Sequence, residues 1–208
     1  MDIRGHGAAS MRRPVTLQAV IGDVAKLAPP RFDLCGYSMG GRLALHVALA
    51  LGPRVARLVL IGASPGLDNP QERARRRGAD EQLAVSIERS TIEQFVRGWE
   101  RNPLLAGLPP PVAAAVRADR LRNTPDGLAC ALRGLGTGGL PSLWDRLGEL
   151  AVPVTLVVGE RDHKFREIAG RMAERIPETR VEVVPGAGHA VHLEAPEALA
   201  AIVADGDR

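Results

Sequence analysis

The chain has 208 residues, 45% hydrophobic and 25% charged, which is long enough for one domain with a substantial core and ordinary for a soluble globular protein. Its net charge is only +3 and aromatic residues make up 3%, so we expect no nucleic-acid partner. No apolar run approaches the ~20 residues that cross a bilayer, and the N-terminus lacks the apolar stretch of a signal peptide, so we expect a cytoplasmic protein without a membrane partner.

Apolar runs that predict strands alternate with helical patterns along most of the chain. In chain order we expect a strand at 32–37, a helix at 42–51, a strand at 57–62, a strand at 153–159, a helix at 167–176, a strand at 180–184 and a helix at 196–204. The strand runs are continuously apolar, which is typical of parallel strands covered on both faces. The alternation therefore predicts an α/β fold built on a parallel sheet.

The segment 68–140 differs from the rest of the chain. It is arginine-rich and helix-like, shows no strand signal, and is bordered by the turn-forming stretches SPGLDNP and GLGTGGLP. We interpret it as a helical cap inserted between two strands. The predicted domain division is a core of residues 1–67 and 141–208 and a cap of residues 68–140. The two cysteines, Cys35 and Cys130, are expected to be buried free thiols.

A serine framed by glycines lies between the first predicted strand and the first predicted helix. Residues 36–40 read Gly-Tyr-Ser-Met-Gly, the G-x-S-x-G pattern, with Ser38 at its centre. In a strand-to-helix turn, glycines two residues away on each side leave room for close backbone approach and expose the serine hydroxyl. The N–H of Met39, at the start of the helix, is then a candidate donor to an oxyanion.

A nucleophilic serine needs a base, and a histidine base needs a carboxylate that orients it. Asp162 follows the predicted strand 153–159 and His189 follows the strand 180–184, so both lie beyond strand carboxyl ends, where open α/β sheets bind ligands. Glu160 is the alternative acid. His163 and His192 are the alternative bases, and His163 is expected to face solvent.

Arginines accompany this serine motif. Arg42 follows Ser38 by one helical turn, and the cap supplies Arg76, Arg120 and a tryptophan, Trp99. Guanidinium groups bind carboxylates through paired hydrogen bonds, so several arginines in one site indicate a substrate with several carboxylates.

The Ser–Asp–His order resembles the α/β-hydrolase superfamily. A closer resemblance is to the 2-succinyl-6-hydroxy-2,4-cyclohexadiene-1-carboxylate synthases of the menaquinone pathway. It is carried by GYSMGGRLAL, IGASPGL, ERARRRGAD, FVRGWERNPLL, RADRLRNTPDGLACALRGLGTGGLPSLW, GERDHKF and PGAGHAVHLEAPE. These pieces cover nearly the whole chain from residue 32 onward, including the cap.

This resemblance implies a lyase. The enzyme would eliminate pyruvate from 2-succinyl-5-enolpyruvyl-6-hydroxy-3-cyclohexene-1-carboxylate, a small polycarboxylate, without a metal or organic cofactor. Ser38, His189 and Asp162 would form the catalytic triad, with an oxyanion donor at Met39. The residues implied around the substrate are Tyr37, Arg42, Arg76, Trp99 and Arg120, and Arg122 is a rival to the last of these. The oligomeric state is not indicated by the sequence.

The N-terminus departs from that family. Residues 2–7, DIRGHG, resemble a D-x-P-G-H-G loop that follows the family's fourth strand, with Arg4 in place of the proline. The resemblance thus implies an N-terminally truncated core without the loop that supplies the second oxyanion N–H. We expect a misassigned start. Two alternatives stay open: a serine hydrolase of a carboxylated ester or diketone, and an inactive truncated fragment.

Overall fold

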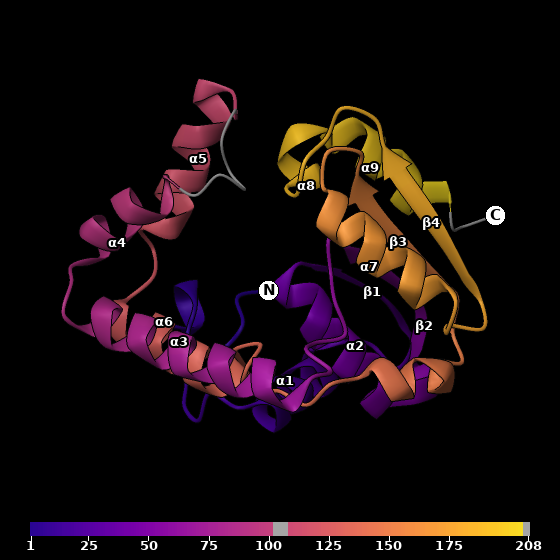
Figure 1. Cartoon of the computed structure of the whole chain (residues 1–208), viewed down its shortest axis with the longest axis horizontal. Coiled ribbons are helices and arrows are strands. Elements are labelled where there is room, and N and C mark those ends of the chain that lie inside the picture. The colour runs from indigo at the N-terminus through magenta and orange to yellow at the C-terminus, as the bar shows by residue number, and fades with distance from the viewer. Residues whose placement is uncertain (102–107, 206–208) are drawn as a thin grey trace. The chain divides into compact units, whose positions relative to one another are not determined.

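The computed structural model describes residues 1–101 and 108–205, whose helices and strands are shown in Figure 1. The chain separates into two compact units. The sheet unit comprises Val24–Pro65 and Leu143–Arg208, and the helical unit comprises Met1–Asp23 and Gly66–Ser142. The sequence analysis did not predict the helix α1 (Leu17–Leu27). The boundary between the two units, after Asp23, falls within this helix.

The sheet unit contains a parallel sheet with the strand order β1-β2-β3-β4. The strands are β1 (Phe32–Tyr37), β2 (Val55–Ile61), β3 (Val154–Gly159) and β4 (Thr179–Val184). The register pairs Tyr37 with Ile61 and Gly159 with Val184, so the carboxyl ends of the strands lie at one edge. The expected parallel α/β sheet is confirmed, with each strand within two residues of its predicted bounds.

Helices cover both faces of this sheet (Figure 1). Alternate strand residues point to opposite faces, so Leu58 and Leu156 pack on one side, while Val59 and Val157 pack on the other. The first face is covered by α2 (Met39–Leu51), α7 (His163–Ala173) and the 3-10 turn η4 (Trp144–Glu149). The second is covered by α8 (Val191–Glu194) and α9 (Pro196–Ala204). Burial on both faces explains why the inner strands β2 and β3 are apolar at successive positions, whereas the outer strands β1 and β4 are mostly exposed or partly buried.

Among the described residues after 66, the helical unit contains four longer helices. They are α3 (Pro70–Glu88), α4 (Ile92–Trp99), α5 (Pro110–Arg120) and α6 (Pro125–Leu135). Side-chain caps begin three of them: Asn69 accepts backbone N–H groups of α3, Thr91 forms a capping box for α4, and Thr124 caps α6. The helices α3 and α6 pack together, and Arg133 of α6 is paired with both Glu81 and Glu88 of α3.

The first 23 residues group with the helical unit, whereas the sequence division placed all of 1–67 with the sheet. The reason is their close packing on α6. A Cβ atom added at Gly5 would lie 2.6 Å from the carbonyl oxygen of Gly127. A Cβ atom added at Gly134 would likewise clash with the carbonyl oxygen of Val15. Arg13 is paired with Asp126 of the same helix. These are contacts between distant segments, which the local pattern did not reveal.

Cys35 is exposed and Cys130 is partly buried, and both are free thiols. The expectation of buried thiols is therefore wrong for Cys35, which lies in β1 on the strand face where Asp33 is also exposed. Across residues 1–101 and 108–205, no helix has both the length and the apolar character needed to cross a membrane.

Candidate active site

Ser38 alone connects β1 to α2, and its backbone is strained. Its φ of 49° and ψ of −111° make it the only non-glycine residue with a positive φ in the part of the chain that the structure describes. Such strain costs on the order of 1–3 kcal/mol and persists where packing holds it. The turn is the sharp strand-to-helix connection that G-x-S-x-G predicts.

Glycines allow the end of β1 and the first turn of α2 to approach each other closely at this turn. A Cβ atom at Gly36 would lie 2.6 Å from the carbonyl oxygen of Gly40, and one at Gly41 would lie 2.5 Å from the Cβ of Ala63. At Gly40 an added Cβ would meet nothing within 4 Å. A side chain would therefore not fit at Gly36 or Gly41. At Gly40, the second glycine of the motif, a side chain would fit, and it is the carbonyl oxygen of this residue that lies close to Gly36.

Met39 is the first residue of α2. The first N–H groups of an α-helix have no intrahelical acceptor, and the helix dipole makes this end attractive to negative charge. The backbone thus places the N–H of Met39 directly after the serine, where it can donate to an anionic oxygen.

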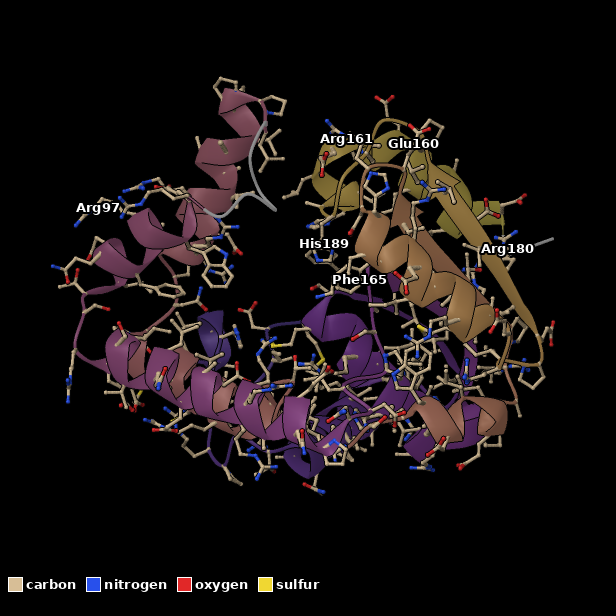
Figure 2. The ribbon with its side chains drawn as sticks, in the orientation of Figure 1. Arg97, Glu160, Arg161, Phe165, Arg180 and His189 are labelled. Atoms are coloured by element: carbon tan, nitrogen blue, oxygen red, sulfur yellow. The ribbon has the colours of Figure 1, made fainter. Side chains whose placement is uncertain are left out.

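Ser38, His189 and Asp162 form a hydrogen-bonded array in the sheet unit. Nε2 of His189 lies 3.1 Å from Oγ of Ser38, and Nδ1 of His189 lies 2.6 Å from Oδ2 of Asp162. Since a carboxylate only accepts, Nδ1–H donates to Asp162 and Nε2 can accept the serine proton. The side chains of His189 and Asp162 are both 6% exposed. Figure 2 shows His189 beside Phe165 at the end of the sheet.

The two carboxylate oxygens of Asp162 accept different hydrogen bonds. Its Oδ2 faces His189, while its Oδ1 accepts the backbone N–H of Phe165 at 3.3 Å and caps α7. This cap explains why α7 begins at His163, four residues before the predicted helix. The alternative acid, Glu160, instead accepts the backbone N–H of Gly186 at 2.8 Å. The geometry therefore selects Asp162 as the histidine's carboxylate partner.

The imidazole of His189 is enclosed by neighbours, two of which the sequence reading missed. The ring of Phe165 is centred 4.5 Å away and that of Tyr37 5.3 Å away. Gly62, which follows β2 with a φ of 51°, leaves space for the imidazole, because a Cβ there would lie 2.9 Å from Cε1 of His189. The only signal for Gly62 was its position as the last residue of a predicted strand.

The two other candidate bases are placed differently. His192 stacks on Tyr37 with ring centroids 4.2 Å apart, and burial, followed by the neighbouring His189, lowers its pKa. Its Nδ1 is buried and has no hydrogen-bond partner among the described residues. His163 is exposed at the start of α7, as expected. The hydrogen bond to Ser38 is made by His189.

The remaining predicted site residues belong to both units. Tyr37 ends β1 and Arg42 is buried in α2, its backbone N–H donating to the carbonyl of Ser38 at 3.0 Å. Arg76, Trp99 and Arg120 belong to the helical unit.

In α3, Nε of Arg76 donates to the buried Asp80 at 2.7 Å. Trp99 is 37% exposed at the end of α4, 5.5 Å from the ring of Phe95. Part of the FVRGWERNPLL motif, residues 102–105, lies outside the described residues.

Arg120 and its rival Arg122 also differ. Arg120 is partly buried at the end of α5 and its carbonyl accepts from Asn123. Arg122 is exposed, and its terminal nitrogens are paired with Asp119 and Asp2 at 2.6 and 2.7 Å. The guanidinium of Arg122 is therefore already engaged with carboxylates of the chain itself. No cluster of three or more potential metal-ligating side chains occurs in residues 1–101 and 108–205.

Known proteins match nearly the whole chain. A family model described as "Alpha/beta hydrolase family" matches residues 1–202. A Bacillus subtilis protein provisionally named 2-succinyl-6-hydroxy-2,4-cyclohexadiene-1-carboxylate synthase is 42% identical over 217 residues, covering 99% of this chain and 78% of its own length.

The Salmonella paratyphi C protein of that name is 34% identical, over 94% of this chain and 77% of its own. The solved structure of MenH from S. aureus superposes with a TM-score of 0.92 at 33% identity, covering 99% of this chain and 80% of that one.

Proposed function

The chain belongs to the alpha/beta hydrolase family, and on that premise we propose that it is a lyase of menaquinone biosynthesis. It eliminates pyruvate from 2-succinyl-5-enolpyruvyl-6-hydroxy-3-cyclohexene-1-carboxylate and yields 2-succinyl-6-hydroxy-2,4-cyclohexadiene-1-carboxylate. The observation that carries this proposal is the 42% identity to a relative of that name across 99% of the chain, because the similarity spans the helical unit as well as the serine motif.

The Ser38–His189–Asp162 array supplies the base for this reaction. Nε2 of His189 takes the proton of Ser38, and the serine oxygen removes the ring proton next to the succinyl ketone. Asp162 holds the imidazole in the tautomer that accepts at Nε2 and stabilises the imidazolium that forms. The 3.1 Å and 2.6 Å distances in the array support these roles.

The electron pair released from the C–H bond moves onto the ketone oxygen as an enolate. Backbone N–H groups, including that of Met39, stabilise this charge, since a proton next to a carbonyl is removable only if the enolate is held. Collapse of the enolate forms the new C=C bond and breaks the C–O bond to the enolpyruvyl group. The leaving enolate takes up the proton from His189 and becomes pyruvate. No step calls for a metal or an organic cofactor.

The substrate's carboxylates are bound by arginines. We assign this role to Arg42, Arg76 and Arg120. We assign Tyr37 and Trp99 to contacts with the ring of the substrate. Guanidinium pairs with carboxylates through two parallel hydrogen bonds, and this geometry favours a polycarboxylate over a neutral ester.

The test is release of pyruvate from the enolpyruvyl substrate by the purified chain. We expect release by the wild-type protein, its loss in Ser38→Ala, and a kcat/KM for release that is lowered by about 10- to 100-fold in Arg76→Ala. Hydrolysis of simple esters by the wild-type protein, abolished by Ser38→Ala and untouched by Arg76→Ala, without pyruvate formation, would instead identify a serine hydrolase.

A further inference from the structure

Glu194, the last residue of α8, binds the backbone on both sides of His189. Its Oε2 accepts the N–H of Gly188 at 2.8 Å and its Oε1 accepts the N–H of Ala190 at 3.1 Å. The carboxylate is 16% exposed. One side chain therefore holds the peptide groups that flank the histidine of the array.

These hydrogen bonds are stronger than ordinary ones. A carboxylate that accepts from backbone N–H groups makes charge-assisted bonds, roughly twice as strong as neutral ones. Ala190 is fully buried, so its N–H needs an acceptor within the protein. Gly188 permits the close approach, because a Cβ there would lie 3.0 Å from Oε1 of Glu194. With both flanking N–H groups bound to one carboxylate, the backbone of His189 has little freedom to rotate.

Glu194 also reaches the loop that carries Asp162. Nη2 of Arg161, the residue before Asp162, lies 2.8 Å from Oε2 of Glu194. Figure 2 labels Arg161 in the loop after β3. The side chain of Arg161 is 66% exposed, so this ion pair is weak compared with the two backbone hydrogen bonds. The carboxylate nevertheless joins the two loops that supply the acid and the base.

We propose that Glu194 is a positioning residue for the reaction: it holds His189 with Nε2 toward Ser38 and Nδ1 toward Asp162. Glu194 touches none of the reacting atoms itself. Its effect passes through the backbone of residues 188–190, and the kinetic part of its test rests on the proposed function. Neither G-x-S-x-G nor the Ser–Asp–His order points to this residue.

Glu194→Gln is the sharpest variant. Glutamine keeps the length of the side chain but has one acceptor oxygen and an NH₂ group that can only donate, so one of the two backbone N–H groups would face a donor. Displacement of a catalytic group by about 1 Å costs on the order of 10²-fold in rate. We expect kcat for pyruvate release to fall by about that factor while KM stays close to the wild-type value.

Matched variants separate positioning from simple destabilisation. Glu197→Gln changes an exposed glutamate three residues later and should leave kcat unchanged. Arg161→Ala removes only the exposed ion pair and should lower kcat far less than Glu194→Gln does. In a His189→Ala background, Glu194→Gln should reduce the residual rate no further. An unchanged kcat in folded Glu194→Gln, or an equal loss in both backgrounds, would overturn the proposal.

A spectroscopic measurement is independent of the substrate. The Nδ1 proton of His189 is expected to give a low-field NMR resonance because it is hydrogen-bonded to Asp162, and this resonance should weaken or shift in Glu194→Gln and persist in Glu197→Gln. An unshifted resonance in folded Glu194→Gln would contradict the positioning role. If Glu194→Gln does not fold, Glu194→Asp, which retracts the carboxylate by one methylene and keeps its charge, is measured by the same two criteria. A wild-type protein that shows the resonance but releases no pyruvate would refute the proposed function and leave the positioning role to be decided by NMR.

Discussion

Arg76 and Asp80 are joined one helical turn apart on α3, with Nε of the guanidinium 2.7 Å from Oδ1 of a carboxylate that is only 7% exposed. This bond uses one of the five N–H groups of the arginine. Asp80 is itself fixed from the other side, because its Oδ2 accepts the backbone N–H of Gly138 at 3.4 Å. The direction of the Arg76 guanidinium is thus set by a buried group of its own helix.

Removal of this guanidinium should weaken substrate binding. Hydrogen bonds to charged groups contribute about 1.5–3 kcal/mol, so Arg76→Ala is expected to lower kcat/KM by about 10- to 100-fold, mainly through KM. Arg75→Ala, at the exposed neighbouring position, is the control and should stay near wild type. Equal effects of both substitutions in steady-state kinetics would argue that general positive charge, and not a specific contact of Arg76, matters.

Asp162→Asn should leave the fold intact and reduce kcat severely. An asparagine can still cap α7 through its oxygen but cannot stabilise the imidazolium or hold the required tautomer, and the corresponding change in a Ser–His–Asp enzyme costs about 10⁴-fold. Glu160→Gln is the matched variant, because Glu160 lies in the same loop and bonds Gly186 instead of the histidine. A larger loss in Glu160→Gln than in Asp162→Asn would reverse the assignment of the acid.

Gly62→Ala should reduce both stability and activity. The positive φ of 51° costs a non-glycine residue roughly 1–3 kcal/mol, and the new Cβ would press on the imidazole of His189 at 2.9 Å. Gly52→Ala provides a control with a similar φ of 48° and nothing within 4 Å of the added Cβ. Both variants should unfold at lower denaturant concentration, but only Gly62→Ala should lose turnover. Full activity in folded Gly62→Ala would show that the imidazole tolerates displacement.

His46, buried in α2, should make the folded state sensitive to acid. Burial, and then the positive charges of Arg42 and Arg146, lower its pKa from 6.5 to about 4. Between these two pH values the unfolded chain binds more protons than the folded one, so this group makes stability rise with pH from about 4 to about 6.5 and has no effect above.

Denaturant unfolding of His46→Gln at pH 4.5, 5.5 and 7 measures this contribution. We expect the free energy of unfolding to fall less steeply with decreasing pH in His46→Gln than in the wild-type protein. His163→Gln, at an exposed histidine, is the control and should retain the wild-type slope. Parallel pH profiles for His46→Gln and the wild-type protein would show that His46 is not the group responsible.

The elements and the serine motif could be read from the sequence because they depend on local properties. Strand β1 was predicted with its observed bounds, because a short apolar run bounded by turn residues is a local signal of a strand. Ser38 was found because its glycine neighbours encode the sharp turn within five residues. The order of Ser38, Asp162 and His189 could also be read, since each of these residues lies just after a predicted strand.

The tertiary structure alone decided what depends on contacts between distant segments. The choice of Asp162 over Glu160 required the two loops to meet, because the histidine and its carboxylate are 27 residues apart and the histidine and serine 151 apart. The space left by Gly62, the two bonds of Glu194 and the packing of residues 1–23 on α6 likewise exist only in the folded chain. Propensity and periodicity act over a few residues, whereas hydrogen bonds between loops are set by how the whole sheet brings strand ends together.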